Sequence, residues 1–279
     1  MDWLRQFDAE HFLLFTLVFT RVSGLLMTAP VYGASDAPMR VRALLALALA
    51  VLVAPSQWHV HIDYPGTMLL YLVFVGGELL IGVCLGLGVV VLFSGIQMAG
   101  DLISRAGGLT LSELFDPTFN ADVPLFSRLL MLVGTAVFVC MGGHRVVMAG
   151  LLDTFQSMPP GSSVAGIFAA PSATEVPFLQ ALSETFVTLL AESFQLGIRV
   201  CIPVVVAALL ATLVLGLVSR TLPQLNVMAV GFSLNAMLTF SIMFLSLGAA
   251  FLMFQERIEP ALGMLLEMLK VPLQSRWLI

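Results

Sequence analysis

Residues 100–123 read GDLISRAGGLTLSELFDPTFNADV and lie between two long apolar runs. The stretch holds two adjacent glycines, Gly107 and Gly108, and a turn signal at Asp116-Pro117. Hydroxyl and carboxylate side chains alternate with apolar ones. Such a segment cannot face lipid, because its backbone polar groups would have no hydrogen-bond partners there. We therefore expect a loop here and not a seventh membrane helix.

The same stretch is too apolar for an ordinary solvated linker. Leu111, Leu114, Phe115 and Phe119 argue against disorder, and connections of this length are uncommon unless they serve a function. We interpret the rest of the chain as a membrane assembly that holds this loop in place. The alternative is a plain extramembrane loop between two spans.

Composition makes an integral membrane protein almost unavoidable. The 279 residues are 59% hydrophobic and 10% charged, with a mean hydropathy of +1.02, whereas soluble domains carry roughly 25% charged residues. The net charge is -5 and no basic run is present, so nucleic acid is not an expected partner. The acidic N-terminus does not resemble a cleavable signal peptide. The three cysteines lie in separate apolar runs without metal-ligand spacing, so we expect no metal and no cofactor.

The predicted fold is all-α, a helical membrane protein in which about six long apolar segments form hairpins and some do not span the bilayer. We expect one helical domain over 1–279, with an exposed linker at about 157–177 and an amphipathic tail at about 260–279. The fifth segment contains Pro203, which predicts either two helical pieces or one kinked helix. The six segments are approximately His11–Thr28, Val41–Val53, Thr67–Met98, Leu125–Met141, Phe178–Val218 and Val227–Phe254.

Orientation is not decided by the basic residues. Counted over six spans, each side of the membrane collects five arginines or lysines. Short loops weigh most in the positive-inside rule, and they favour the side of Arg40, Arg105 and Arg220 as cytoplasmic. Equal numbers of basic residues on the two sides are also expected if some of the helices do not span the membrane.

Five charged residues interrupt the apolar runs, and each would cost about 3 kcal/mol at mid-bilayer. They must face protein or water. Arg21 and Glu78 are candidates for a pair across two helices, while Glu192 and Arg199 share one helix face with Gln195. These groups fit either a transport route or structural pairs in a polar interior. The five are Arg21, Glu78, Glu184, Glu192 and Arg199.

Two further patterns bear on function. Gly82-x-x-x-Gly86 would let a second helix backbone come close. Signatures of enzymes are missing: there is no phosphate loop, no HExxH motif, and His144 has no nucleophile or metal ligand at a useful spacing. We therefore predict a protein that is not an enzyme.

Residues 216–232, GLVSRTLPQLNVMAVGF, resemble the signature of the flagellar biosynthetic protein FliR family and of its virulence counterpart, the T subunit of the type III secretion export apparatus. The Pro223-Gln224-x-Asn226 element is the most specific part. Other stretches agree in the family's order, and the resemblance covers nearly the whole chain. Ser233 and Asn235 depart from it, since many members have Pro and a basic residue there. The agreeing stretches are Arg21-Val-Ser-Gly24, Gly77-Glu78-Leu-Leu-Ile-Gly82, Gly108-Leu-Thr-Leu, Asp116-Pro117, Gly142-Gly143-His144 and Glu192-Ser-Phe194.

The resemblance implies a subunit of the flagellar protein-export gate in the bacterial inner membrane. In the family one copy joins P and Q subunits and works with large cytoplasmic export subunits, which implies unfolded proteins as substrates. The family's plug loop maps onto about residues 107–122. The resemblance implies plug or pore roles for Gly107, Gly108, Leu111, Leu114, Phe115, Asp116 and Pro117. It implies subunit contacts or a polar interior for Arg21, Glu78, Glu192, Arg199, Arg220, Pro223, Gln224 and Asn226.

A second hypothesis comes from the interrupting charges alone. In it the chain is a stand-alone small-solute carrier with Glu78, Glu184, Glu192 and Arg199 as its relay. Such carriers usually contain internal repeats or paired broken segments, and the sequence contains no visible repeat. Purification discriminates the two, since a carrier would be a monomer that transports a solute, whereas a gate subunit would co-purify with partners.

Overall fold

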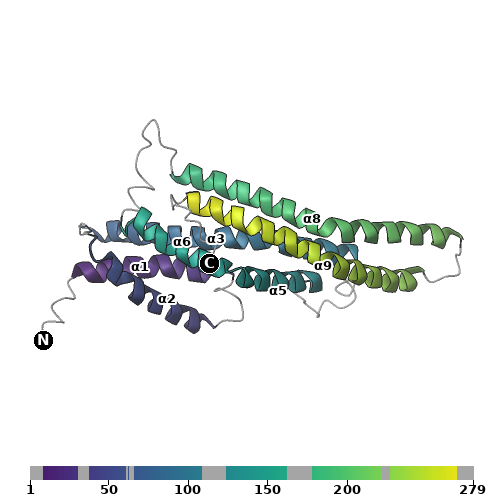
Figure 1. Cartoon of the computed structure of the whole chain (residues 1–279), viewed down its shortest axis with the longest axis horizontal. Coiled ribbons are helices and arrows are strands. Elements are labelled where there is room, and N and C mark those ends of the chain that lie inside the picture. The colour runs from purple at the N-terminus through teal and green to yellow at the C-terminus, as the bar shows by residue number, and fades with distance from the viewer. Residues whose placement is uncertain are drawn as a thin grey trace. The chain divides into compact units, whose positions relative to one another are not determined.

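The computed structural model describes residues 9–30, 38–60, 62, 66–108, 124–161, 178–221 and 227–268. Within these ranges the chain is helical and contains no strand (Figure 1). The elements, in order, are α1 (Ala9–Thr28), α2 (Met39–Val53), the 3-10 helix η2 (Ala54–Gln57), α3 (Met68–Ala106), α5 (Leu125–Cys140), α6 (Gly143–Ser157), α8 (Phe178–Thr221) and α9 (Val227–Met268).

Five of these helical segments are long and apolar enough to cross a membrane: α1, α2 together with η2, α3, α8 and α9. A sixth crossing results if α5 and α6 count as one broken span. The break between them contains Gly142, whose φ of +75° lies in the left-handed region that glycine tolerates best. The expectation of an all-α membrane protein with about six apolar segments is confirmed.

Three element boundaries differ from the sequence prediction. Helix α3 continues through the polar residues after Gly100 and ends at Ala106. Asp101 can lie in the helix because its carboxylate accepts a hydrogen bond from the Ser127 hydroxyl. Gly100 can lie in the helix because it has no Cβ, and a Cβ there would clash with the Ser127 backbone against which it packs. Tertiary contacts therefore extend the helix beyond the point where its apolar run stops.

Helices α8 and α9 are the other two differences. Helix α8 is one continuous helix with Pro203 inside it, which excludes the alternative of two separate pieces. Helix α9 continues past Pro260, so residues up to Met268 do not form a separate surface helix. The side chains of Leu265 and Leu266 are buried there, against Gly88 and Gly150 respectively. This packing offsets the hydrogen bond that a proline removes from a helix. Residues 269–279 lie outside the described part.

The chain divides into two compact units, 1–90 with 142–189 and 260–279, and 91–141 with 190–259. In unit 1, α1 and α3 approach closely. A Cβ on Gly24 would lie 2.9 Å from the carbonyl oxygen of Leu79, and one on Gly86 would lie 3.0 Å from the amide nitrogen of Ala29. A Cβ on Gly82 would clash with the backbone of Arg21. The predicted role of Gly82-x-x-x-Gly86 in close helix packing is confirmed.

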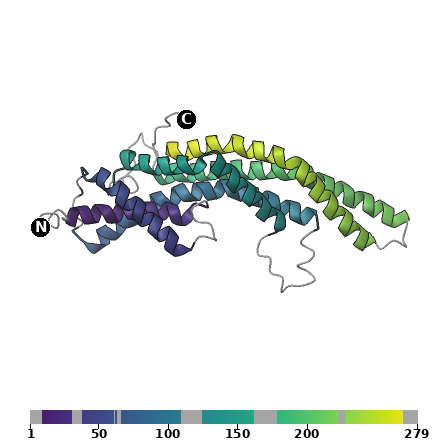
Figure 2. The same ribbon diagram turned by 60° about the horizontal axis from the view of Figure 1, so that its bottom comes forward.

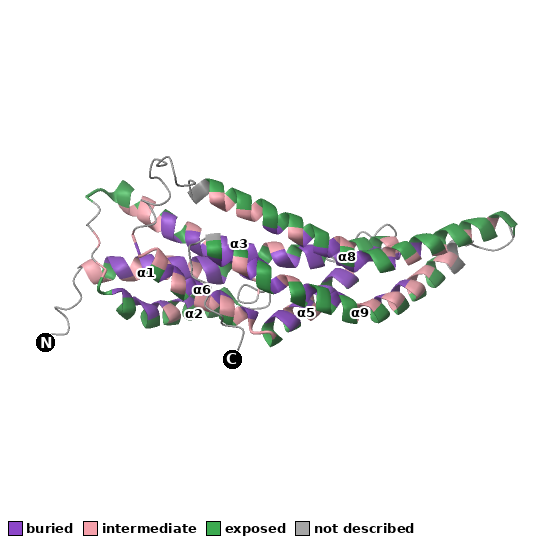
Figure 3. Ribbon diagram, turned by 45° about the horizontal axis from the view of Figure 1, so that its top comes forward, coloured by how far each residue is buried: buried purple, intermediate pink, exposed green. Residues whose placement is uncertain are grey.

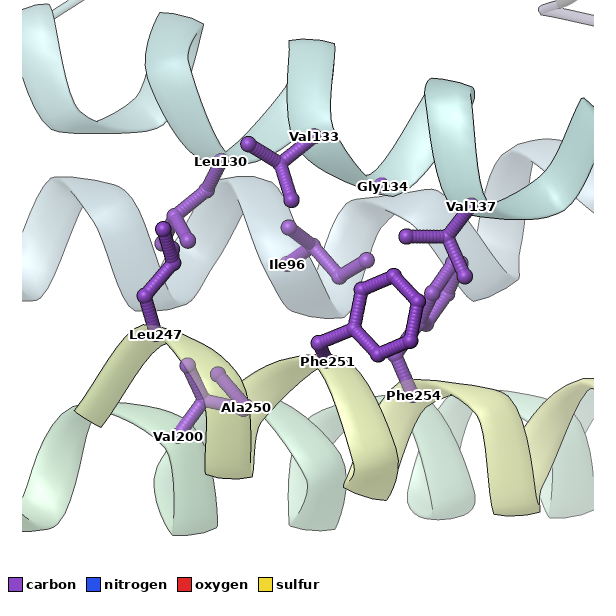
Figure 4. Close-up of a pocket in the computed structure, with 10 residues that line it drawn as sticks. All are labelled: Ile96, Leu130, Val133, Gly134, Val137, Val200, Leu247, Ala250, Phe251 and Phe254. Atoms are coloured by element: carbon purple, nitrogen blue, oxygen red, sulfur yellow. The ribbon is translucent and has the colours of Figure 1, made fainter. Parts of the chain in front are cut away.

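Unit 2 is built from the C-terminal part of α3 (from Val91), from α5 and from the parts of α8 and α9 within 190–259. Its core contains an apolar pocket in which all four helices meet, shown in Figure 4. Phe93 packs edge-on against both Phe138 and Phe254, with ring centroids 5.5 and 5.6 Å apart. Every pocket side chain is a hydrocarbon, so the pocket is part of the core and offers no polar anchor for a ligand. The lining residues are Ile96, Leu130, Val133, Gly134, Val137, Val200, Leu247, Ala250, Phe251 and Phe254.

Candidate functional site

The end of α3 is the described part of the predicted plug site, and each of its two glycines is required for its own reason. Gly107 is buried, and a Cβ there would lie 2.9 Å from the Thr239 hydroxyl oxygen. Gly108 has a φ of +73°, and its amide donates to the carbonyl of Arg105 at 3.1 Å. This is the left-handed residue that commonly ends a helix. The glycine pair therefore stops α3 and directs the chain away from it.

A side chain from α9 closes the same helix end. The Asn235 amide nitrogen donates to the carbonyl oxygen of Ala106 at 3.0 Å. That carbonyl is one of the acceptors that a helix C-terminus leaves without an intrahelical partner. An uncharged amide on α9 therefore supplies a hydrogen bond to the last turn of α3.

Three buried polar atoms near this helix end have no hydrogen-bond partner among the described residues. They are the hydroxyl oxygens of Ser104 and Thr239 and the side-chain oxygen of Asn235. Ser104 is 1% exposed and Thr239 is fully buried. A buried polar group without a partner costs about 1–3 kcal/mol. The end of α3 therefore has unused hydrogen-bonding capacity, which a ligand or a rearranged backbone could satisfy.

Sequence reasoning did not single out Ser104 or Thr239. The usable signal was the i, i+4 spacing of Asn235 and Thr239 in the first part of α9, which carries no charge and on which the two polar side chains share one face. The remaining predicted plug residues lie outside the described part of the chain. They are Leu111, Leu114, Phe115, Asp116 and Pro117.

In unit 1, Arg21 and Glu78 form a fully buried ion pair, as the sequence suggested. The Nε of Arg21 donates to Oε2 of Glu78 at 2.6 Å, and both side chains have zero exposure. Arg21 also donates to the carbonyl oxygens of Thr154 at 3.1 Å and Met158 at 3.0 Å. The other carboxylate oxygen of Glu78 accepts from the amide of Gly161 at 3.0 Å.

This network has a clear structural effect. The guanidinium carbon of Arg21 lies 4.4 Å from the centre of the Phe155 ring, a cation–π contact. The two carbonyls that Arg21 binds belong to the C-terminal end of α6, where a cation is favourable. One arginine therefore connects α1, α3 and the end of α6. The arrangement is that of a structural link, because both charges are fully enclosed and paired.

The remaining charges do not form a chain. Glu192 pairs with Arg257 of α9, and both side chains are about one-third exposed. The expected face of Glu192, Gln195 and Arg199 is present on α8, but Arg199 is exposed and sequence reasoning missed Arg257 altogether. Glu184 is exposed and accepts from Gln180 at 3.0 Å. The four charges of the solute-carrier hypothesis thus have separate surroundings.

The predicted subunit-contact segment after α8 is only partly described. Arg220 is exposed in the last turn of α8. Pro223, Gln224 and Asn226 lie outside the described residues. Their roles stay predictions.

Comparison with known proteins identifies the family. Residues 12–261 match the model of bacterial export proteins, family 1. The chain is 34% identical to the flagellar biosynthetic protein FliR of Aquifex aeolicus over 240 residues, which cover 86% of this chain and 87% of that protein. It is 28% identical to FliR of Bacillus subtilis, covering 85% and 87% of the two chains. It is 30% identical to the secretion system apparatus protein SsaT of Salmonella typhimurium over 64% of this chain and 63% of that protein. The chain belongs to family 1 of the bacterial export proteins.

Proposed function

We propose that the chain is a non-enzymatic subunit of the flagellar type III export gate in the bacterial inner membrane. Two of the relatives above are named as flagellar biosynthetic proteins and one as a secretion apparatus protein. The names apply to those proteins, and the similarity over most of the chain is the reason to extend the role to this one. The gate would pass unfolded flagellar proteins, and the partners would be P and Q subunits and the large cytoplasmic export subunits.

We further propose that residues 107–122 plug the channel of this gate. The observation that carries this proposal is the end of α3, where Gly107 and Gly108 end a long helix at the start of this segment. Apolar side chains such as Leu111 and Leu114 could close a pore by packing and excluding water.

The unused hydrogen-bonding atoms at this helix end support a second arrangement of the plug. Ser104, Thr239 and Asn235 each have a buried polar atom without a described partner. A backbone segment that moved onto them would gain about 1 kcal/mol for each hydrogen bond made. A few such bonds are enough to balance two states of a gate.

The test replaces residues 109–116 by a Gly/Ser segment of the same length, so that Gly107 and Gly108 are retained. The control is an equal-length Gly/Ser replacement of residues 163–170, in the expected linker. We expect the first variant to assemble with its partners and to let ions leak across the inner membrane, and the control not to leak. Normal assembly without any leak in the first variant would refute the plug.

A separate measurement tests the subunit role itself. Purification in mild detergent should yield this chain together with partner subunits. A monodisperse monomer that transports a small solute would instead favour the carrier hypothesis. Ion leak and co-purification are measured independently. The plug hypothesis can therefore be refuted while the proposed subunit role is retained.

A further inference from the structure

Helix α3 is covered on most sides, and its uncovered side chains change character along the helix. In the most apolar window of α3, 61% of the residues are buried, compared with 22% for α8. Figure 3 shows this difference as purple over much of α3 and green along most of α8. Every exposed residue from Met68 to Val90 is apolar or a glycine. The exposed residues from Val91 to Ala106 are Ser94, Gln97, Leu102 and Arg105, of which all but the leucine are polar.

These polar residues share one narrow face of α3, which we call the polar strip. It consists of Ser94, Gln97, Arg105 and the half-buried Asp101. At about 100° per residue, the four positions lie within an arc of about 80°. Extended by two residues beyond the helix, the same arc includes Gly108, where the backbone becomes left-handed. The polar strip therefore leads to the point at which the chain leaves α3.

Helix α5 begins beside this part of α3 (Figure 2) and fixes the position of Asp101. The Ser127 hydroxyl, which is fully buried, contacts Oδ1 of Asp101 and the carbonyl oxygen of Gln97. Among the described residues no donor binds Oδ2 of Asp101. The carboxylate is thus held from the protein side and is free to accept hydrogen bonds on its other side.

The neighbouring helices leave the polar strip uncovered. At its start, the Ser94 hydroxyl lies 3.4 Å from that of Ser193 on α8. Helix α9 packs on another face of α3, at Ala106 and Gly107, which are about 80° or more from the strip.

The charges of the polar strip require water or polar groups in front of it. Asp101 and Arg105 would each cost about 3 kcal/mol against hydrocarbon at mid-bilayer. Arg105 forms no ion pair with any carboxylate in the described part of the chain. In a chain in which only 10% of the residues are charged, a hydrophilic face beside the proposed plug segment is a strong indication of an aqueous surface.

We propose that the polar strip is the surface over which this subunit contacts the extended polypeptide in transit, next to the plug. The proposal rests on the proposed function and specifies which face meets the exported chain. An unfolded polypeptide presents a backbone N–H and C=O at nearly every residue. The hydroxyl, amide, carboxylate and guanidinium groups of the strip exchange hydrogen bonds with such a backbone without reading its sequence. Asp101 and Arg105 have opposite charges, so neither acidic nor basic segments are retained.

The first test places a photo-crosslinking amino acid at Gln97 of the full chain, in cells where an export substrate fused to a tightly folded domain is stalled in transit. Leu245 is the control position, since it is 84% exposed but lies on α9, which packs on another face of α3. We expect substrate adducts at Gln97 that are lost when export is not engaged, and none at Leu245.

The outcomes separate the strip from the gate role. If the chain co-purifies with partner subunits and Gln97 gives adducts with lipid or a partner but none with the stalled substrate, the strip is refuted and the subunit role is retained. A chain that purifies as a monomer without partners refutes the proposed function and the strip with it.

The second test changes the charge of the polar strip. Arg105→Glu gives the strip two acidic side chains and no basic one. Export of a substrate with an inserted acidic segment should then slow, relative to the same substrate with a basic segment, on the order of fivefold, as expected for like charges about 4 Å apart in water.

Arg199→Glu is the matched control for this charge reversal. Arg199 is also exposed, but it lies about 160° around α8 from Gly197, which contacts Gly95 of α3. It should leave the ratio of the two export rates unchanged. An unchanged ratio in Arg105→Glu, or the same shift in both variants, would contradict the proposal.

Discussion

The buried pair of Arg21 and Glu78 gives the sharpest energetic prediction. We consider Arg21→Met, Glu78→Gln and the double variant. The guanidinium nitrogens make hydrogen bonds to the carboxylate and to the carbonyls of Thr154 and Met158, and both charges have zero exposure. Each single variant therefore leaves one buried charge without its counter-charge.

The magnitude follows from that exposure. Removal of one partner of a buried pair typically costs about 3–5 kcal/mol, because the remaining charge stays in a low-dielectric site. The double variant removes both charges, so its cost should fall short of the sum of the two single costs by up to about 3 kcal/mol. For a chain of this size, about 3–5 kcal/mol corresponds to a fall in Tm of roughly 6–20 °C.

The assay is thermal unfolding of the purified protein in detergent, followed by loss of the monodisperse species on gel filtration. Glu184→Gln is the matched control, since Glu184 is exposed and accepts a hydrogen bond from Gln180, and its effect should stay within about 0.5 kcal/mol. If the double variant loses as much stability as the two single variants added together, Arg21 and Glu78 do not stabilise each other and the claim is refuted.

Three further changes test the packing and the subunit contacts. Gly82→Ala should destabilise the protein by about 1–3 kcal/mol because its Cβ meets the α1 backbone. Gly76→Ala in the same helix meets open space and should be neutral or stabilising. Equal Tm values for the two variants would contradict the close approach of α1 and α3. Gly108→Ala should lower the free energy of unfolding by about 1–2 kcal/mol, because the alanine must adopt a left-handed backbone conformation. Gly216→Ala on exposed α8 should not destabilise the protein. The Tm values of the two variants in thermal unfolding test this difference. Arg220→Ala should reduce co-purification with partner subunits more than it raises ion leak, and unchanged co-purification would count against a subunit contact there.

The sequence was sufficient for the helices and insufficient for their ends. Long apolar runs located each candidate span in the described part of the chain. The cost of an isolated charge in a membrane was enough to suggest Arg21 and Glu78 as partners. The end of α3 was placed too early because Asp101 looks like a loop residue until its partner Ser127 is known. The continuation of α9 past Pro260 depends on how Leu265 and Leu266 pack in unit 1.

The candidate site shows the same limit. The glycine pair stood out in the sequence but was expected inside the loop and not at the end of α3. Asn235 could not be foreseen as the group that binds the carbonyl of Ala106, because it is 129 residues away. The partner of Glu192 was missed for the same reason, since Arg257 lies 65 residues further along the chain. Helical periodicity groups residues on one helix, whereas the pairing of two helices depends on their register.

The segment after Gly108 is proposed to stand in the route of exported protein. A photo-crosslinking amino acid at Leu114 tests this placement while an export substrate fused to a tightly folded domain is stalled in transit. We expect an adduct between Leu114 and the stalled substrate, and no such adduct when export is not engaged. Adducts with lipid alone, in cells where the substrate is demonstrably stalled, would contradict it.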